Sequence, residues 1–292
     1  MRGKYNNIFL CYLFFNNMIK INNLHFTYHK ESENPKKALT AVSLSIKEGE
    51  FVSIIGQNGS GKTTLAKHLN AILPPTKGSV LIDGINTRNK ENLWDIRKKV
   101  GMVFQNPENQ IICSTVRSDI SFGPENLGID RVEIEKRVDE AIELMGLSKY
   151  QDYPPHMLSI GLKQKVTIAG VLAMGTKYII FDEPTSMLDP LGKKEVFEVI
   201  LNLRKKREVT IIYITHLMEE VLKSDRAIVM SEGKIVLDDS PKKIFSKLKI
   251  LRSLSLDVPI IPDISSRLNK RGISIPSQII TTQELVNCLK QL

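Results

Sequence analysis

The sequence has 292 residues, of which 42% are hydrophobic and 25% charged, so it is long enough for one large or two modest globular domains. Its formal net charge of +9 is spread along the whole chain, which fits a lysine-biased, solvated surface and decides nothing about nucleic acid or membranes. The three cysteines have neither paired nor metal-type spacing, which argues against a disulfide framework and a zinc site.

The N-terminal stretch contains an apolar run, Ile8 to Phe15, that is too short to span a bilayer, because a spanning helix needs roughly 20 apolar residues. A signal peptide is one explanation, since Arg2 and Lys4 precede the run, although no small-residue cleavage site follows it. We favour the other explanation, an upstream extension with Met18 as the true start. No other segment is predicted to cross a membrane, so a membrane role would need a partner.

Strand-like and helical patterns alternate along the chain, which predicts an α/β fold with a largely parallel sheet. Ile19 to Phe26 and Ala41 to Ile46 alternate apolar and polar residues, as half-buried strands do. Phe51 to Ile55 predicts a short buried strand that leads into a glycine-rich loop, and Thr63 to Leu69 predicts a helix directly after that loop.

A helical insertion is predicted between Asn106 and about Leu158, because Glu133 to Leu147 carries apolar residues at the spacing of an amphipathic helix. The strand pattern returns in three later segments, Tyr178 to Phe181, Thr210 to Ile214 and Ala227 to Met230. After about Ser246 several prolines interrupt the pattern, which indicates a small accessory segment at the C-terminal end.

The glycine-rich loop reads Gly-Gln-Asn-Gly-Ser-Gly-Lys-Thr over residues 56–63 and fits the phosphate-binding pattern G-x-x-x-x-G-K-[ST] in full. Glycines let the backbone form a nest of N–H groups aimed at phosphate oxygens, and the following helix adds its positive end. Lys62 can reach the β- and γ-phosphates, and the Thr63 hydroxyl can ligate Mg²⁺. The predicted nucleotide contacts are Gly56, Asn58, Gly59, Ser60, Gly61, Lys62, Thr63 and Thr64.

A second feature is a hydrophobic strand that ends in two acids, Asp182 and Glu183. A strand end beside the phosphate loop would let Asp182 hold the Mg²⁺ shell and Glu183 polarise a water for in-line attack on the γ-phosphate. Such a pair is commonplace by itself and gains its meaning from the phosphate loop. His216 follows a later strand, where a single histidine is more often structural or simply exposed.

In order and spacing these motifs resemble the ATP-binding cassette (ABC) transporter ATPases from about Met18 to about Ser246. The resemblance implies a P-loop NTPase fold with a RecA-like core sheet, an N-terminal antiparallel β subdomain, a helical insertion and a small C-terminal extension. We therefore expect a disordered or spurious extension over 1–17 and a nucleotide-binding domain over 18–246, with a helical subdomain at about 106–160. Residues 247–292 are expected to form an accessory or dimerisation segment.

The resemblance also implies roles for single residues. Gln105 matches the glutamine that senses Mg²⁺ and the attacking water, so it is a candidate for both catalysis and the metal shell. His216 falls at the switch histidine, which contacts the γ-phosphate, and it thereby becomes a catalytic candidate beside Glu183. Tyr28 matches the aromatic residue that stacks on adenine. Asp189, in Ser-Met-Leu-Asp, resembles the loop that crosses the dimer.

The motif Leu-Ser-Ile-Gly-Leu at 158–162 stands where the family has its signature Leu-Ser-Gly-Gly-Gln, which presses on the γ-phosphate held by the opposite subunit. Ser159 and Gly161 survive as donors, but Ile160 would be strained at positive φ and Leu162 cannot hydrogen-bond ribose. Losing one oriented donor typically costs about 10²–10³ in rate. We therefore predict an asymmetric dimer in which an unlike partner with an intact signature completes the faster site.

Four stretches, at 101–110, 121–129, 168–175 and 181–190, resemble the ATP-binding subunits of energy-coupling factor (ECF) transporters, most of all the first of their two ATPases. This resemblance implies ATP and Mg²⁺ as cofactors and a place on the cytoplasmic side of the cell membrane. It also implies three partners: a second ABC ATPase, a transmembrane coupling subunit and a membrane protein that captures a vitamin or metal ion. The motor of another ABC importer is the alternative.

Two other classes of protein are disfavoured. A soluble ABC ATPase of ribosomes or DNA would carry two cassettes or a long coiled coil, and neither pattern is present, so no nucleic-acid partner is expected. A regulatory subunit without turnover is disfavoured because Glu183 and His216 are both present.

Overall fold

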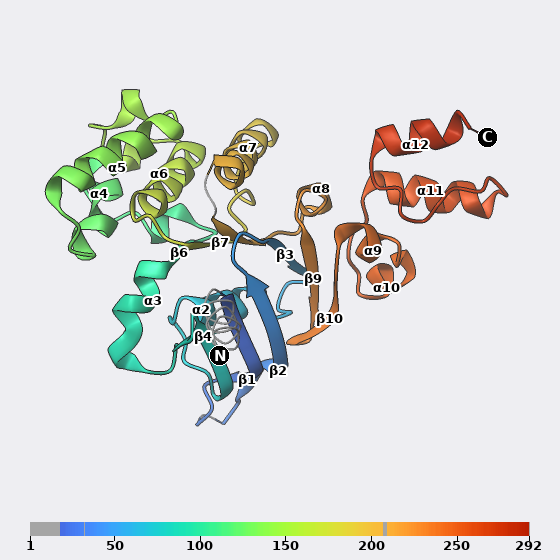
Figure 1. The fold of residues 1–292 in the computed structure, drawn as a ribbon, viewed down its shortest axis with the longest axis horizontal. Coiled ribbons are helices and arrows are strands. Elements are labelled where there is room, and N and C mark those ends of the chain that lie inside the picture. The colour runs from blue at the N-terminus through green and yellow to red at the C-terminus, as the bar shows by residue number, and fades with distance from the viewer. Residues whose placement is uncertain (1–17, 32, 207–208, 292) are drawn as a thin grey trace, which may run out of the picture.

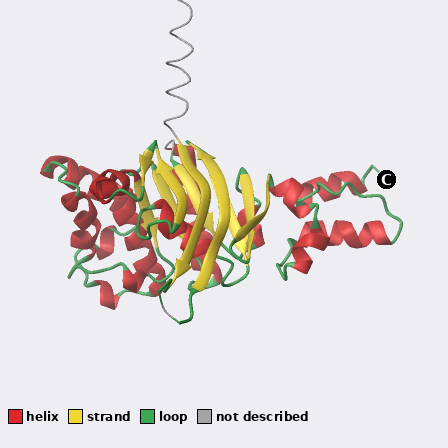
Figure 2. Ribbon diagram, turned by 90° about the horizontal axis from the view of Figure 1, so that it is seen from below, coloured by secondary structure: helices red, strands yellow, loops and turns green. Residues whose placement is uncertain are grey.

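The computed structural model describes residues 18–31, 33–206 and 209–291 (Figure 1). Two sheets lie at the centre, with a group of helices at one end of the long axis and the C-terminal helices at the other (Figures 1 and 2). The extension that we expected over 1–17 lies outside the described residues.

The smaller sheet is antiparallel and has the strand order β2-β1-β4-β5. Its strands are β1 (Met18–Tyr28), β2 (Lys36–Lys47), β4 (Lys77–Ile82) and β5 (Ile85–Asn86). The alternating pattern correctly predicts a strand with one buried face, since Ile19 and Ile21 of β1 are both buried. The antiparallel β subdomain is therefore present, and it contains two short strands that the sequence pattern did not predict.

The larger sheet has six strands in the order β10-β9-β3-β8-β7-β6. It consists of β3 (Phe51–Gly56), β6 (Val100–Val103), β7 (Tyr178–Asp182), β8 (Thr210–Ile214), β9 (Arg226–Ser231) and β10 (Lys234–Asp239). Five strands run parallel and only β10 is antiparallel to its neighbour. The parallel strands β3, β7 and β8 are completely buried, which explains why they read as continuous apolar runs.

Helices cover both faces and both ends of this core. The first ones are α2 (Lys62–Leu69) and α3 (Leu93–Lys99), followed by α4 (Val116–Asn126), α5 (Arg131–Leu144) and α6 (Ile160–Ala173). After β7 come α7 (Pro190–Lys206) and the single turn α8 (Met218–Val221). Short 3₁₀ turns lie at Lys90–Asn92, Pro107–Asn109, Ser148–Tyr150 and Pro155–Met157.

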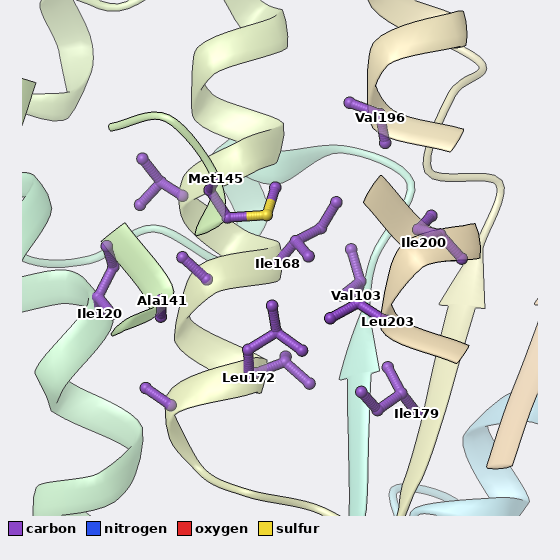
Figure 3. Packing of buried hydrophobic residues seen from close by; sticks show 14 of the residues in the cluster. Val103, Ile120, Ala141, Met145, Ile168, Leu172, Ile179, Val196, Ile200 and Leu203 are labelled. Carbon is purple, nitrogen blue, oxygen red and sulfur yellow. The ribbon is translucent and has the colours of Figure 1, made fainter. Parts of the chain in front are cut away.

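The helices α4, α5 and α6 form one packed layer, which we call the helical layer. It extends beyond residue 160, where the predicted helical subdomain ends, because α6 belongs to it. Figure 3 shows Ile168 and Leu172 of α6 between Ala141 of α5 and Ile179 of the core sheet, and all four side chains are buried. The layer is thus fixed to the sheet by apolar contacts. The helix that we predicted to run to Leu147 ends at Leu144, because Gly146 takes the left-handed conformation that terminates helices.

The C-terminal segment consists of α9 (Pro241–Phe245), α10 (Leu248–Ser253), α11 (Ile260–Lys270) and α12 (Thr282–Leu289). Its first part is anchored on the core, since Phe245 and Leu256 are buried in one cluster with Ile55 of β3 and Met218 of α8. The last two helices extend away from the strands (Figure 2). The segment is thus joined to the strand that leads into the phosphate loop.

A buried carboxylate ties the two sheets together. Asp83, in the turn after β4, accepts hydrogen bonds from Lys99 Nζ (2.8 Å), Lys177 Nζ (3.2 Å) and Tyr178 Oη (2.5 Å). Burial alone would raise the pKa of Asp83, but the hydrogen bonds from Lys99 and Tyr178 and the lysine charges hold it below its ordinary value. The ion cluster therefore fixes the small sheet against β7.

Candidate functional site

The carboxyl ends of β3, β8 and β7 meet at one edge of the large sheet because these strands are parallel neighbours. The phosphate loop leaves β3, His216 comes shortly after β8, and Glu183 directly follows β7. Ligands of open α/β sheets bind at this edge. The sheet order therefore assembles residues that lie far apart in the sequence.

Two glycines give the phosphate loop its shape. Gly61 has φ 103° as the N-cap of α2, a conformation that costs other residues strain. Gly56 lies so close to β9 that an added Cβ would be 2.3 Å from the Met230 carbonyl oxygen. The loop thus delivers the N-terminus of α2, with its unpaired N–H groups and positive dipole end, to the cavity.

Lys62 is folded back along its own loop. Its buried ammonium group donates hydrogen bonds to the carbonyl oxygens of Gly56 (2.8 Å) and Gln57 (3.0 Å). Burial lowers the pKa of Lys62, and the charges of Glu183 and Asp182 oppose this effect. A cation is thus kept in the loop, next to two carboxylates.

Asp182 and Thr63 form the donor pair expected for a magnesium shell. The Thr63 hydroxyl donates to Asp182 Oδ1 at 3.1 Å, and the Asp182 side chain is 3% exposed. Burial raises the pKa of Asp182, while the hydrogen bond from Thr63 opposes the rise. Hydroxyl and carboxylate oxygens are the hard ligands that Mg²⁺ takes together with phosphate and water. The donor set therefore fits this ion.

Glu183 is the meeting point of the predicted catalytic residues. Gln105 Nε2 donates to Glu183 Oε2 at 3.3 Å, and His216 Nδ1 lies 3.5 Å from the same oxygen. The Glu183 backbone has φ 50°, a left-handed conformation that costs a non-glycine residue energy. Three side chains from three separate segments thus face one another.

These residues surround one cavity of about 980 Å³. Tyr28, at the end of β1, lines it and makes a hydrogen bond with the Thr64 hydroxyl at 3.2 Å. The other predicted residues that line it are Gly56, Asn58, Gly59, Gly61, Lys62, Thr63, Thr64, Gln105, Glu183 and His216. Ser60 and Asp182 are buried and do not line the cavity themselves. The cavity is large enough for a nucleoside triphosphate, since ligand sites of this kind measure about 300–1,000 Å³.

Three predicted contacts lie elsewhere on the chain. Ser159, Gly161 and Asp189 line a separate cavity of about 240 Å³, beside Ile160 and Leu162. The Ser159 hydroxyl is the N-cap of α6 and accepts a hydrogen bond from the Leu162 N–H at 3.4 Å. The strain that we expected at Ile160 is absent, because this residue begins α6 without a positive φ. Leu162 still replaces the glutamine of the family signature and offers no side-chain hydrogen bond.

Several residues in the lining of the large cavity come from segments in which the sequence predicted no site residue, among them two lysines of β2 and three residues of the C-terminal segment. Lys36 and Lys37 reach it because β2 pairs with β1, which sets Lys36 opposite Tyr28. Ser255, Leu256 and Asp257 come from the C-terminal segment, for which the sequence predicts only an accessory role. No motif marks these positions, and only the tertiary fold brings them to the nucleotide loop.

Comparison with known proteins gives consistent results. The family described as ABC transporter matches residues 39–186. The chain is 51% identical to the energy-coupling factor transporter ATP-binding protein EcfA1 of Clostridioides difficile (strain 630), over 94% of this chain and 99% of that protein. It is 46% identical to the cobalt import ATP-binding protein CbiO of Syntrophus aciditrophicus (strain SB), over 92% and 94%.

Two solved structures share the fold. CbiO1 from Clostridium perfringens, part of the ABC transporter complex CbiONQ, superposes with a TM-score of 0.72 and 36% identity, over 87% of this chain and 99% of that one. The cassette MJ0796, a dimer in a post-hydrolysis state bound to ADP and Pi, gives a TM-score of 0.70 and 31% identity, over 76% and 98%. The fold that we predicted from the sequence is thereby confirmed.

Proposed function

We propose, since the chain belongs to the energy-coupling factor group of ABC transporter ATP-binding proteins, that it is the ATP-hydrolysing motor of a vitamin or transition-metal importer. The observation that carries this proposal is the convergence of Lys62, the Thr63–Asp182 pair and the Glu183 cluster at one cavity. A cobalt import relative at 46% identity supports a metal ion as the cargo.

In the proposed reaction, Lys62 exchanges its hydrogen bonds with the loop carbonyls for the β- and γ-phosphate oxygens of ATP. Mg²⁺ held by Thr63 and Asp182, with Gln105 in its outer shell, would neutralise developing charge on the phosphates. Glu183 orients a water and accepts its proton as the water attacks the γ-phosphorus in line. His216 lies 3.5 Å from the Glu183 carboxylate and lines the same cavity, so it would contact the γ-phosphate. ADP and phosphate are the products.

We further propose that the site is completed by a second, unlike ATPase. Ser159, Gly161 and Asp189 lie outside the cavity of their own chain, which is expected if they act on nucleotide held by a partner. The dimeric state of the related cassette MJ0796 supports this arrangement. Because Leu162 offers no hydrogen bond to ribose, the site closed by this chain's signature is the slower one.

The transmembrane coupling subunit would dock on the helical layer beside Gln105. Exposed apolar side chains there support this proposal, with Ile112 63% exposed, Tyr153 50% and Phe122 43%. Across the described ranges, no helix has the length and apolar character needed to cross a bilayer. We therefore propose a peripheral position at the cytoplasmic face, with the substrate-capture protein reached through the coupling subunit.

Affinity purification from native membranes tests this function. The proposal predicts that a second ATP-binding subunit and a polytopic membrane protein copurify with the chain, and that the assembly hydrolyses ATP. Recovery of ribosomes without a membrane partner would contradict it. Recovery of a two-domain permease and a periplasmic-type binding protein would instead support the motor of another ABC importer.

A further inference from the structure

Glu220 is a buried carboxyl group to which no motif assigns a role. It lies in α8, four residues after His216, and is only 6% exposed. Thr185 Oγ1 donates a hydrogen bond to Glu220 Oε1 at 3.0 Å, and Thr215 Oγ1 donates to Oε2 at 2.5 Å. Buried carboxyl groups are costly unless fully hydrogen-bonded, so this one needs an explanation.

The two threonines flank the catalytic residues. Thr185 comes two residues after Glu183, and Thr215 directly precedes His216. The Thr215 hydroxyl also accepts a hydrogen bond from the Leu217 N–H at 3.0 Å, so it spans the backbone of His216. One carboxyl group thus bridges the segment after β7 and the segment after β8.

The backbone of Glu183 is held by two further hydrogen bonds, one to β8 and one within the segment after β7. Its N–H donates to the carbonyl oxygen of Ile214 in β8 at 3.0 Å. Its own carbonyl oxygen accepts from the hydroxyl of Ser186 at 2.9 Å. The positive φ of Glu183 costs a non-glycine residue energy, and these hydrogen bonds offset that cost. The Glu220 bridge adds side-chain bonds that join the segment after β7 to the segment after β8.

We propose that Glu220 is a positioning residue that holds Glu183 and His216 in register for hydrolysis. This inference rests on the roles proposed above for those two residues. Glu220 itself does not line the nucleotide cavity and acts through the two threonines. A shift of about 1 Å in a catalytic group can cost about 10²-fold in rate, so a bridge of this kind affects turnover more than binding.

Burial raises the pKa of Glu220, and hydrogen bonds from Thr215 and Thr185 oppose the rise. Tyr213, from β8, faces the same carboxyl group, and burial and the Glu220 charge raise the pKa of its phenol. The bridge needs two hydrogen-bonding atoms at the end of the side chain, one for each threonine, and does not need a net charge. A glutamine can accept from one threonine and donate to the other, and should therefore preserve the bridge.

The test compares Glu220→Ala and Glu220→Gln in the assembled membrane complex. Glu220→Ala should lower kcat about 10- to 100-fold while the KM for ATP stays within about twofold, because the phosphate loop is untouched. Glu220→Gln should recover most of the turnover. Glu219→Ala, an exposed glutamate on the same helix, is the matched control and should behave like the wild type.

A double-mutant cycle separates positioning from support of the fold. If Glu220 acts through His216, then Glu220→Ala should add little to the loss already caused by His216→Ala, measured in single turnover. Equal losses in both backgrounds would overturn the proposal, as would a folded Glu220→Ala complex with unchanged kcat. If Glu220→Ala does not fold, Thr185→Val and Thr215→Val each remove one bond of the bridge, and unchanged kcat in both would overturn it as well. Steady hydrolysis by Glu183→Gln would instead contradict the proposed function.

Discussion

Replacing Gly61 by alanine probes the shape of the phosphate loop. Gly61 has φ 103°, and an added Cβ would lie 2.8 Å from the Ala38 carbonyl oxygen and 2.9 Å from Leu39 Cδ2. The left-handed backbone costs an alanine about 1–2 kcal/mol. Overpacking against β2 adds about 1–3 kcal/mol. Together these two costs should destabilise the native loop conformation by about 2–5 kcal/mol relative to a relaxed loop.

Gly49→Ala is the matched control. Gly49 has φ 75° in the turn before β3, but an added Cβ there has no heavy atom within 4 Å. Only the backbone cost of about 1–2 kcal/mol applies, which lowers Tm by about 2–4 °C per kcal/mol in a chain of this size. Its affinity for ATP should be unchanged.

The assay is the Kd of a fluorescent ATP analogue, measured together with Tm. Because each 1.4 kcal/mol corresponds to about a tenfold change, Gly61→Ala should weaken ATP binding at least about tenfold. The reasoning is refuted if folded Gly61→Ala binds ATP as tightly as the wild type does. It is also refuted if Gly49→Ala weakens binding to the same extent.

Three further predictions concern the sheet junction, the C-terminal segment and the signature. Asp83→Asn should lower the free energy of unfolding by about 2 kcal/mol at pH 7, since it weakens buried, charge-assisted bonds. The folded-state pKa of Asp83 is depressed. The difference in the free energy of unfolding between variant and wild type, measured by urea titration, should therefore persist above pH 3.8 and vanish as the pH falls through the folded-state pKa. The hydrogen bond from Lys242 and those from two backbone N–H groups lower the pKa of Glu284 to about 2, so acid should loosen α12 as pH falls from 4.5 toward about 2. Hydrogen exchange should detect this loosening, and Glu284→Gln should show it already at pH 7. Restoring Ile160→Gly together with Leu162→Gln should raise the turnover of the complex up to about twofold as the slower site gains a donor, and an unchanged rate would count against the asymmetry.

The elements that carry the motifs could be predicted because their patterns are strong and local. The strands β3, β7 and β8 are buried on both faces, so they read as apolar runs that end in the phosphate loop, in Asp182 or shortly before His216. The short strand β6 was not predicted, because its four residues include a glycine and are too few to show an alternation of apolar and polar side chains. The apolar pattern continues to Leu147, whereas α5 ends at Leu144 because Gly146 takes the left-handed conformation that terminates helices.

Within the site, the residues that belong to sequence motifs could be predicted. The residues that tertiary packing brings to the cavity could not. Lys36 lines the cavity through cross-strand pairing with Tyr28, and strand register is not readable from a single pattern. Ser255 and Asp257 line it because Leu256 is buried beside Met218, a contact between remote segments. The expected strain at Ile160 failed for a local reason, since α6 starts at that residue with ordinary helical geometry.

The central claim is that the phosphate loop and the acids after β7 act on one magnesium-bound ATP. The most direct measurement compares ATP binding and steady hydrolysis by the assembled complex carrying Glu183→Gln in this chain. Our account predicts that the variant binds MgATP like the wild type and loses nearly all the turnover of the site formed by this chain's loop. Wild-type hydrolysis at that site would contradict it, and so would a loss of binding without any loss of folded protein.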